Sequence, residues 1–286
     1  MGSVLLVLLA AFFWGLSGGI GGYLTGKGWD PIVVSFFRGA VGLFFAFAWL
    51  LASPYGSGLR SLRLWLFSAL AGLGVAGNFG FYYLSIAEGS VAVAATLMYT
   101  APVFVYTAAF VFGFETLSRL KLGAIGLVLL GMVLLTGAYD LSASAVTPIA
   151  VVAGLMAGIS YAVFIFGFKS AASRGSPQAI LVIAFAVLSV VLLGISSSAE
   201  ITRVFAAPIW PLFLALGVFG AGLSFMFYIV GLRQISPAIA SIIAMVEPIT
   251  ASVFGVAFLQ ESLSVVQMLG MVLILFTITA MATSFK

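Results

Sequence analysis

Two charged residues lie deep within long apolar stretches of the sequence. Arg38 lies inside segment 31–52, and Glu247 lies near the middle of segment 237–259. A charge at the centre of a membrane helix costs roughly 2.5–3.5 kcal/mol on insertion scales, so both should face protein or a water-filled cavity. Glu247 could bind a proton or a substrate amine, or could bond backbone that Pro248 frees. The sequence leaves open whether the two charges pair.

Uncharged polar and aromatic side chains at helical spacing form a second set of candidates. Asn78 and Tyr82 are four residues apart and share one helix face, and Ser241 and Met245 do the same. Further candidates for a cavity lining are Trp14, Ser17, Tyr99, Met156, Tyr161, Ser224 and Tyr228. Helix packing or an interfacial aromatic belt would also explain such residues. As a lining they favour a neutral, partly apolar solute, because phosphate or sulfate would need several cations.

Two prolines lie inside apolar runs, Pro102 and Pro248. Each removes one backbone hydrogen bond from a helix and is expected to kink it. The two prolines lie at matching places in two similar halves of the sequence, which are compared below. Kinks at matching places favour hinge or gating positions, although a static kink that improves packing is the alternative.

The elements that position these residues must lie in a membrane. Of 286 residues, 64% are hydrophobic and 6% are charged, whereas soluble domains carry roughly 25% charged residues. The apolar runs are continuous and about twice the length of a barrel strand, which favours helices. The chain has no cysteine and no histidine, which excludes disulfides and the usual zinc sites. We expect no metal and no cofactor.

Apolar runs and helix breakers predict an all-α membrane protein with ten transmembrane helices. The predicted spans are 3–25, 31–52, 62–87, 91–114, 120–138, 146–168, 177–196, 208–232, 237–259 and 265–284.

Lys and Arg in the loops predict the orientation. With a cytoplasmic N-terminus, two basic residues lie outside, Lys27 and Arg203. The inner set is Arg60, Arg63, Arg119, Lys121, Lys169, Arg174, Arg233 and Lys286. This bias predicts that both termini are cytoplasmic. It also explains the net charge of +4 without nucleic acid as a partner.

The two halves of the sequence match at one fixed offset of 146 positions, the difference between 177 and 31. The matched pairs are Pro31 with Pro177, Phe79 with Phe225, Phe81 with Phe227, Tyr82 with Tyr228, Ser90 with Ser236, Pro102 with Pro248 and Glu115 with Glu261. Five predicted helices per half give two inverted repeats, 1–140 and 141–286, because an odd number reverses the direction of entry. Inverted repeats are common in secondary transporters, with the substrate near the midplane.

The arrangement resembles the EamA-like branch of the drug/metabolite transporter superfamily over nearly the whole chain. The residues that carry the resemblance are Trp14-Gly15, Phe37-Arg38, Ala101-Pro102, Glu115 to Ser118, Glu247-Pro248, Glu261 to Ser264 and Gly270. The resemblance implies ten helices, cytoplasmic termini and a central cavity lined by helices 1, 3, 4, 6, 8 and 9. It implies a structural role for Arg38, on a helix outside the cavity. More narrowly, the chain resembles bacterial exporters of aromatic and other neutral amino acids.

The predicted function is export of small neutral solutes, most of all amino acids, across the bacterial inner (cytoplasmic) membrane by alternating access. With Glu247 as the one deep carboxylate, we expect facilitated transport. The alternatives are a proton-coupled drug or metabolite antiporter and an importer. A membrane enzyme such as an intramembrane protease is disfavoured, because there is no His, and Asp30 and Asp140 lie in outer loops. A scaffold would have larger loops. The expected partners are a small-molecule substrate and the lipid bilayer, with the protein a monomer or weak dimer.

Overall fold

The computed structural model describes residues 2–89, 91–140, 147–260 and 262–283, and these are helices joined by short loops. Within them, nine helices are long and apolar enough to cross a membrane, and a shorter apolar helix covers Val265–Met281. The unbroken helices are α1 (Gly2–Gly26), α2 (Pro31–Ala52), α3 (Leu62–Ala87), α6 (Arg119–Thr136), α7 (Pro148–Ala172), α8 (Pro177–Ile195) and α14 (Val265–Thr283). The prediction of an all-α multi-pass membrane protein is therefore confirmed. Ser90, Glu261 and Lys286, used in the repeat and orientation arguments, lie outside the described residues.

Side-chain caps explain where several helices begin. Asp30 accepts hydrogen bonds from the backbone N–H groups of Ile32 and Val33 at 2.7 and 3.1 Å. Ser176, its counterpart in the second half, caps α8 in the same way. Each cap precedes a proline in the first turn, where the missing N–H costs no hydrogen bond.

Two predicted spans are each broken into two helices. The fourth consists of α4 (Val91–Met98) and α5 (Ala101–Val111), and the ninth consists of α12 (Pro237–Ile243) and α13 (Val246–Phe258). Pro102 and Pro248 lie in the first turn of α5 and α13, so each proline starts a new helix after a break. The sequence predicted a kink there. The breaks are more complete, and they lie at corresponding places in the two halves.

The eighth predicted span contains a local change of helix type. It consists of α10 (Trp210–Gly217), a π-helical segment, η1 (Val218–Leu223), and α11 (Ser224–Leu232). The sequence placed its start at Pro208, which instead lies in a turn before α10. A short additional helix, α9 (Ser198–Ala206), precedes that turn and lies between the predicted spans 177–196 and 208–232. One π-turn inserted into an α-helix often marks a functional position.

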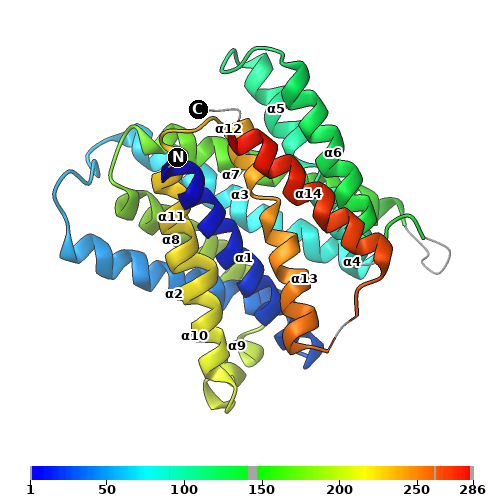
Figure 1. Ribbon diagram of the computed structural model, residues 1–286. Coiled ribbons are helices and arrows are strands. Elements are labelled where there is room, and N and C mark those ends of the chain that lie inside the picture. Colours follow the sequence, from blue (N-terminus) through cyan, green and yellow to red (C-terminus); the bar gives the residue numbers. More distant parts are fainter. Residues whose placement is uncertain (1, 90, 141–146, 261, 284–286) are drawn as a thin grey trace.

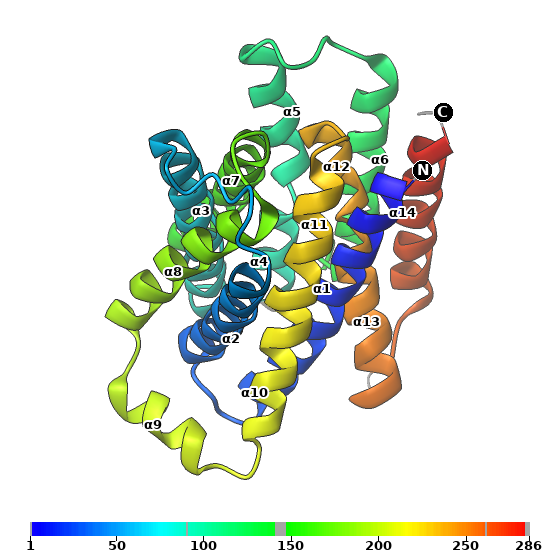
Figure 2. The same ribbon diagram turned by 90° about the vertical axis from the view of Figure 1, so that its left-hand side faces the viewer.

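The helices pack in a pattern that a two-fold repeat predicts. α1 packs against α11 and α13, and α7 packs correspondingly against α3 and α5. α2 packs against its counterpart α8, and α6 against its counterpart α14. Figures 1 and 2 show that α1 begins and α14 ends at the same end of the bundle. We call this the closed end, for reasons given below, and the opposite end, near α9, the open end.

Candidate functional site

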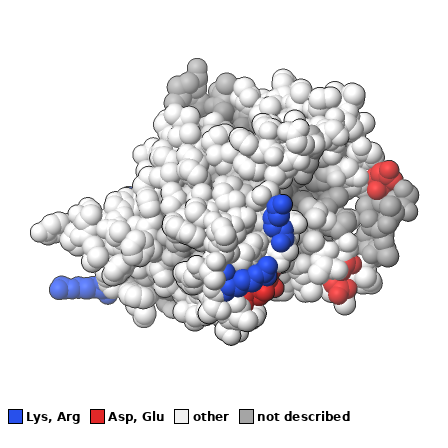
Figure 3. Space-filling model, turned by 90° about the horizontal axis from the view of Figure 1, so that it is seen from below, with Lys and Arg blue, Asp and Glu red and all other residues white. Residues whose placement is uncertain are grey.

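A cavity of about 420 Å³ runs from the middle of the bundle to the open end. Ser17 and Asn78 line it midway along their helices and Glu247 lines it midway along the ninth span, whereas Thr25, Ile86 and Leu259 line it near the helix ends. Most of the lining comes from α1, α2, α3, α4, α6 and α13. Figure 3 looks onto this end, where charged side chains of both signs are scattered among uncharged residues. The family resemblance implied a cavity lined by the first, third, fourth, sixth, eighth and ninth spans. In the structure the second and fifth spans, α2 and α6, also line the cavity, and the sixth span, α7, does not.

Glycines on α1 have two roles: some allow close packing against α13, and another leaves open space in the cavity. Gly15 and Gly19 lie so close to Thr250 and Phe254 of α13 that a Cβ at either position would collide. Gly22 lines the cavity, and a Cβ there would meet no atom within 4 Å. One face of α1 thus fits tightly against α13 while a neighbouring face opens onto the cavity.

Arg38 of α2 lines the cavity, so the placement implied by the family resemblance is wrong for this residue. Its Nε–H donates to the carbonyl oxygen of Gly220, in the π-helical segment η1, at 3.0 Å. The guanidinium carbon lies 5.0 Å from the centre of the Phe79 ring. The residue therefore has both a structural contact and a place in the cavity wall.

Glu247 lines the same cavity from the first turn of α13. Its backbone N–H donates to the carbonyl oxygen of Ala244 at 2.9 Å. Among the described residues its carboxylate makes no hydrogen bond and no ion pair. The described structure therefore contains no bond from Glu247 to the backbone that Pro248 frees, which was one of its two predicted roles. In the described part of the chain no group of three His, Cys, Asp or Glu gathers to hold a metal ion.

Some of the predicted polar and aromatic residues lie together on this cavity. Tyr82, Tyr99, Asn78 and Ser17 all line it, as does Pro248. Asn78 uses its amide nitrogen to bond the carbonyl oxygen of Ala157 at 3.0 Å, which ties α3 to α7. Their role in binding a substrate remains a prediction.

Another group of predicted residues lies toward the closed end, in what we call the aromatic cluster. Its members are Trp14, Tyr161, Phe164, Phe168, Phe185, Phe225 and Tyr228. The Trp14 ring centre lies 5.0 Å from that of Phe225 and 4.9 Å from that of Tyr228. In the described structure Trp14 Nε1, Tyr161 Oη, Tyr228 Oη and the Ser224 hydroxyl are buried without a hydrogen-bond partner.

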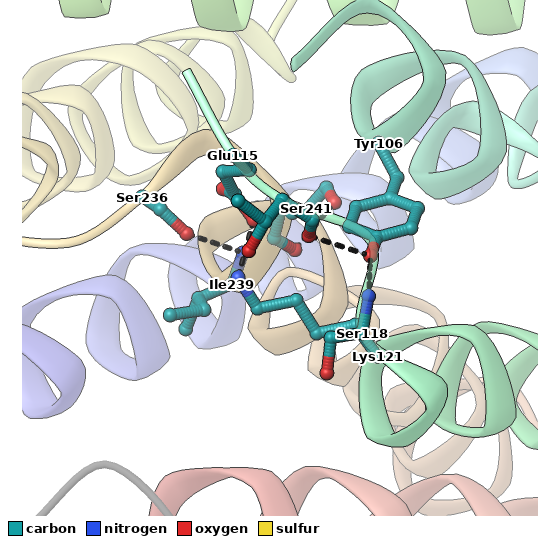
Figure 4. Close-up of polar contacts among 9 residues, drawn as sticks. Tyr106, Glu115, Ser118, Lys121, Ser236, Ile239 and Ser241 are labelled. Atoms are coloured by element: carbon teal, nitrogen blue, oxygen red, sulfur yellow. Dashed lines mark hydrogen bonds and ion pairs between the residues drawn. The ribbon is translucent and has the colours of Figure 1, made fainter. Parts of the chain in front are cut away.

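The remaining predicted residues lie outside the cavity lining. Ser241 is fully buried and donates to the carbonyl oxygen of Ala238 at 2.8 Å. Figure 4 shows it at the contact of α12 with the α5–α6 connection, near the Glu115–Lys121 ion pair and Tyr106. Met245 and Pro102 are buried, and Met156 is partly exposed on α7.

Hydrogen bonds join the helix ends at the closed end. Lys169 of α7 donates to the carbonyl oxygens of Leu232, Arg233 and Ile235 at 2.7, 3.1 and 2.8 Å. Gln178 at the start of α8 donates to the carbonyl oxygen of Ser53, after α2, at 2.8 Å. A wide recess of about 1100 Å³ also lies at this end, and Lys169, Arg174 and Arg233 are among the residues that line it.

Sequence reasoning missed several polar cavity residues. Thr25, Ser35, Tyr83, Thr136 and Ser252 line it. Ser35 is three residues before Arg38 and Ser252 is four after Pro248, so the helical spacing from the predicted residues could have found these two.

A model of one family, described as the EamA-like transporter family, matches residues 1–137 and 148–283 of the chain. The chain belongs to this family. The predicted superfamily is thereby confirmed, and this EamA-like protein is a membrane transporter with two EamA regions.

Its relatives agree with this membership. An uncharacterised transporter of Archaeoglobus fulgidus is 29% identical over 91% of this chain and 90% of its own length. The uncharacterised inner membrane transporter YedA of Escherichia coli K12 is 28% identical over 88% of this chain and 81% of its own length. A solved crystal structure has the same fold, with a TM-score of 0.77 over 99% of this chain and 96% of that chain at 17% identity.

Proposed function

We propose that this EamA-like transporter carries small neutral organic solutes, most of all neutral and aromatic amino acids, through the central cavity. The observation that carries the proposal is a central cavity that reaches one end of the bundle. The cavity continues to the open end, while the aromatic cluster packs toward the closed end and Lys169 bonds the helix ends there. A cavity that opens to one end admits a solute from that side only, as each state of an alternating-access transporter requires.

The substrate class follows from the chemistry of the lining. Tyr82, Tyr99 and Phe79 offer aromatic surface, and Asn78 and Ser17 offer polar groups. One cation in the wall is too few for a phosphate or sulfate substrate. The cavity volume of about 420 Å³ falls in the range of roughly 300–1,000 Å³ of small-molecule sites.

Repeat inversion and orientation belong to the same proposal. The repeats, 1–140 and 141–286, enter the membrane in opposite directions, and the closed end faces the cytoplasm. The Lys and Arg bias supports this, and YedA is named as an inner membrane transporter. A C-terminal reporter that is active only outside the cytoplasmic membrane would contradict the orientation.

Transport is tested by uptake into proteoliposomes with labelled amino acids, nucleosides and drugs. We expect neutral amino acids to move down their gradient, and Tyr99→Ala to reduce transport without preventing membrane insertion. Nucleoside or drug uptake without amino acid uptake would reject the substrate class.

Energy coupling and direction need a separate measurement. We propose facilitated transport whose physiological use is export. An imposed pH gradient without a substrate gradient should then drive no sustained uptake. Uphill movement that disappears in Glu247→Gln would instead establish a proton-driven antiporter.

A further inference from the structure

The cavity wall carries one side chain of each charge. Among the described lining residues, Arg38 is the one basic side chain and Glu247 is the one acidic side chain. They come from α2 in the first half and α13 in the second, so the folded structure brings them to one cavity. The site as a whole is neutral, although each charge in it is costly within a membrane.

Both charged groups keep unused hydrogen-bonding capacity toward the cavity. Arg38 uses Nε for Gly220, and no protein partner of its two Nη groups is found among the described residues. The two residues form no direct ion pair in the described structure, although both line the one cavity. A guanidinium fork and a carboxylate held apart in one cavity can each bind a group of opposite charge.

The corresponding positions of the other repeat carry no charge. At the repeat offset, Ala184 corresponds to Arg38 and Ala101 corresponds to Glu247. The second half packs with an uncharged residue at the Arg38 position, and the first half does so at the Glu247 position. Both charges are therefore specific to this one cavity and are not a feature that the repeat carries twice.

We propose that the cavity binds its solute as a zwitterion, with the solute carboxylate at Arg38 and the solute ammonium group at Glu247. The proposal rests on the proposed function, in which this cavity is the transport site. A zwitterion neutralises both charges at once, whereas a simple amine or carboxylic acid leaves one of them without a partner. The α-amino acids carry the two groups on one carbon, and the lining of Phe79, Tyr82 and Tyr99 receives the side chain.

The test compares three solutes that share one apolar group. Phenylalanine carries both charges, phenethylamine carries the ammonium group, and 3-phenylpropionate carries the carboxylate. Each is used unlabelled to compete with labelled phenylalanine for uptake by the full chain in proteoliposomes, with a matching leucine series in parallel. We expect phenylalanine to compete at least about tenfold better than either analogue, because a site built for a polar group rejects a solute that lacks it.

Variants then assign each charge. In Glu247→Gln the preference for phenylalanine over 3-phenylpropionate should fall about tenfold, and in Arg38→Gln the preference over phenethylamine should fall similarly. Glutamine at position 38 retains a donor for Gly220. The control is Glu200→Gln on α9, a partly exposed carboxylate paired with Arg203 at 3.2 Å outside the cavity lining, and it should change neither preference.

The possible results separate this proposal from the broader one. If wild-type protein takes up no amino acid, the proposed substrate class fails, and with it the zwitterion site. If phenylalanine is taken up but both analogues compete equally well, the zwitterion site alone is rejected. Glu247→Gln that loses pH-driven uptake but keeps every preference also rejects it, and assigns Glu247 to a proton. If Arg38→Gln does not insert, the Glu247→Gln preference decides the result.

Discussion

Several residues of the cavity lining have their counterparts, at the repeat offset, in the aromatic cluster, yet the cavity is hollow and the cluster is filled. Tyr82 faces the cavity, while its counterpart Tyr228 is buried in the cluster. Gly22, which leaves open space on α1, corresponds to Phe168, which fills the cluster from α7.

The difference has two sources that have to be separated. Where the counterparts are the same type, as for Tyr82 and Tyr228, the surroundings of the residue decide which one is exposed. Where they differ, as for Gly22 and Phe168, the sequence itself makes the halves unequal. Opening the closed end would therefore expose an aromatic surface with unpaired donors and would not reproduce the cavity of the open end.

The largest effect is expected from placing, at a cavity position of the first half, the bulky residue found at the corresponding position of the second half. Gly22→Phe should fill the cavity and reduce transport at least about tenfold, the change expected when about 1.4 kcal/mol of binding is lost. Uptake into proteoliposomes at equal protein insertion measures it. The matched control is Gly126→Phe on α6, where the glycine is exposed and a Cβ meets no atom within 4 Å. Full transport by Gly22→Phe would show that this cavity is not the passage.

The reciprocal change removes a large side chain from the aromatic cluster, at the counterpart of Gly22. Phe168→Ala should weaken the aromatic cluster, because a buried Phe→Ala change costs about 3–5 kcal/mol of packing. We expect about tenfold faster labelling from the closed end of a cysteine introduced at Ser224, which is fully buried and directly precedes Phe225 of the cluster. The chain has no cysteine of its own, so labelling by a membrane-impermeant maleimide reports that position alone. Unchanged labelling would mean that the cluster does not close this end.

A smaller effect is expected from the hydrogen bonds at the closed end. Lys169→Met removes three bonds to the backbone between α11 and α12. Each hydrogen bond from a charged donor contributes about 1.5–3 kcal/mol at most, and water replaces part of this at a half-exposed site. The same cysteine should label several-fold faster, and Lys169→Arg should stay near wild type. Lys27→Met at the open end is the control, and an equal effect there would contradict a local role for Lys169.

The smallest effect separates the two tyrosines. Tyr228→Phe removes a buried hydroxyl that has no partner in the described structure. Thermal stability in detergent should stay constant or increase, by about 1 kcal/mol at most, because an unsatisfied buried group is lost. Tyr82→Phe should leave stability unchanged and weaken phenylalanine competition. A clear loss of stability in Tyr228→Phe would mean that its hydroxyl is bonded in the resting protein.

Hydropathy and spacing determined much of this protein without a structure. The membrane environment, the helix positions to within a few residues, the repeat offset and the matching prolines are all properties of local sequence. Apolar length fixes a span wherever the helix packs, and a proline interrupts backbone bonding in any context. Helix α9 escaped notice because nine residues are too few for a spanning pattern.

Only the tertiary structure decided which residues share the cavity. In a membrane helix the lipid-facing and protein-facing sides are both apolar, so periodicity does not reveal which face looks inward. Ser241 therefore looked as good a candidate as Tyr82, although it is buried against its own helix. Arg38 reaches the cavity because α2 packs beside η1 and α3, and Glu247 meets it there from a site more than two hundred residues away in the chain. Their presence in one cavity depends on how the two halves pack together, and the spacing of residues within a single helix does not reveal that packing.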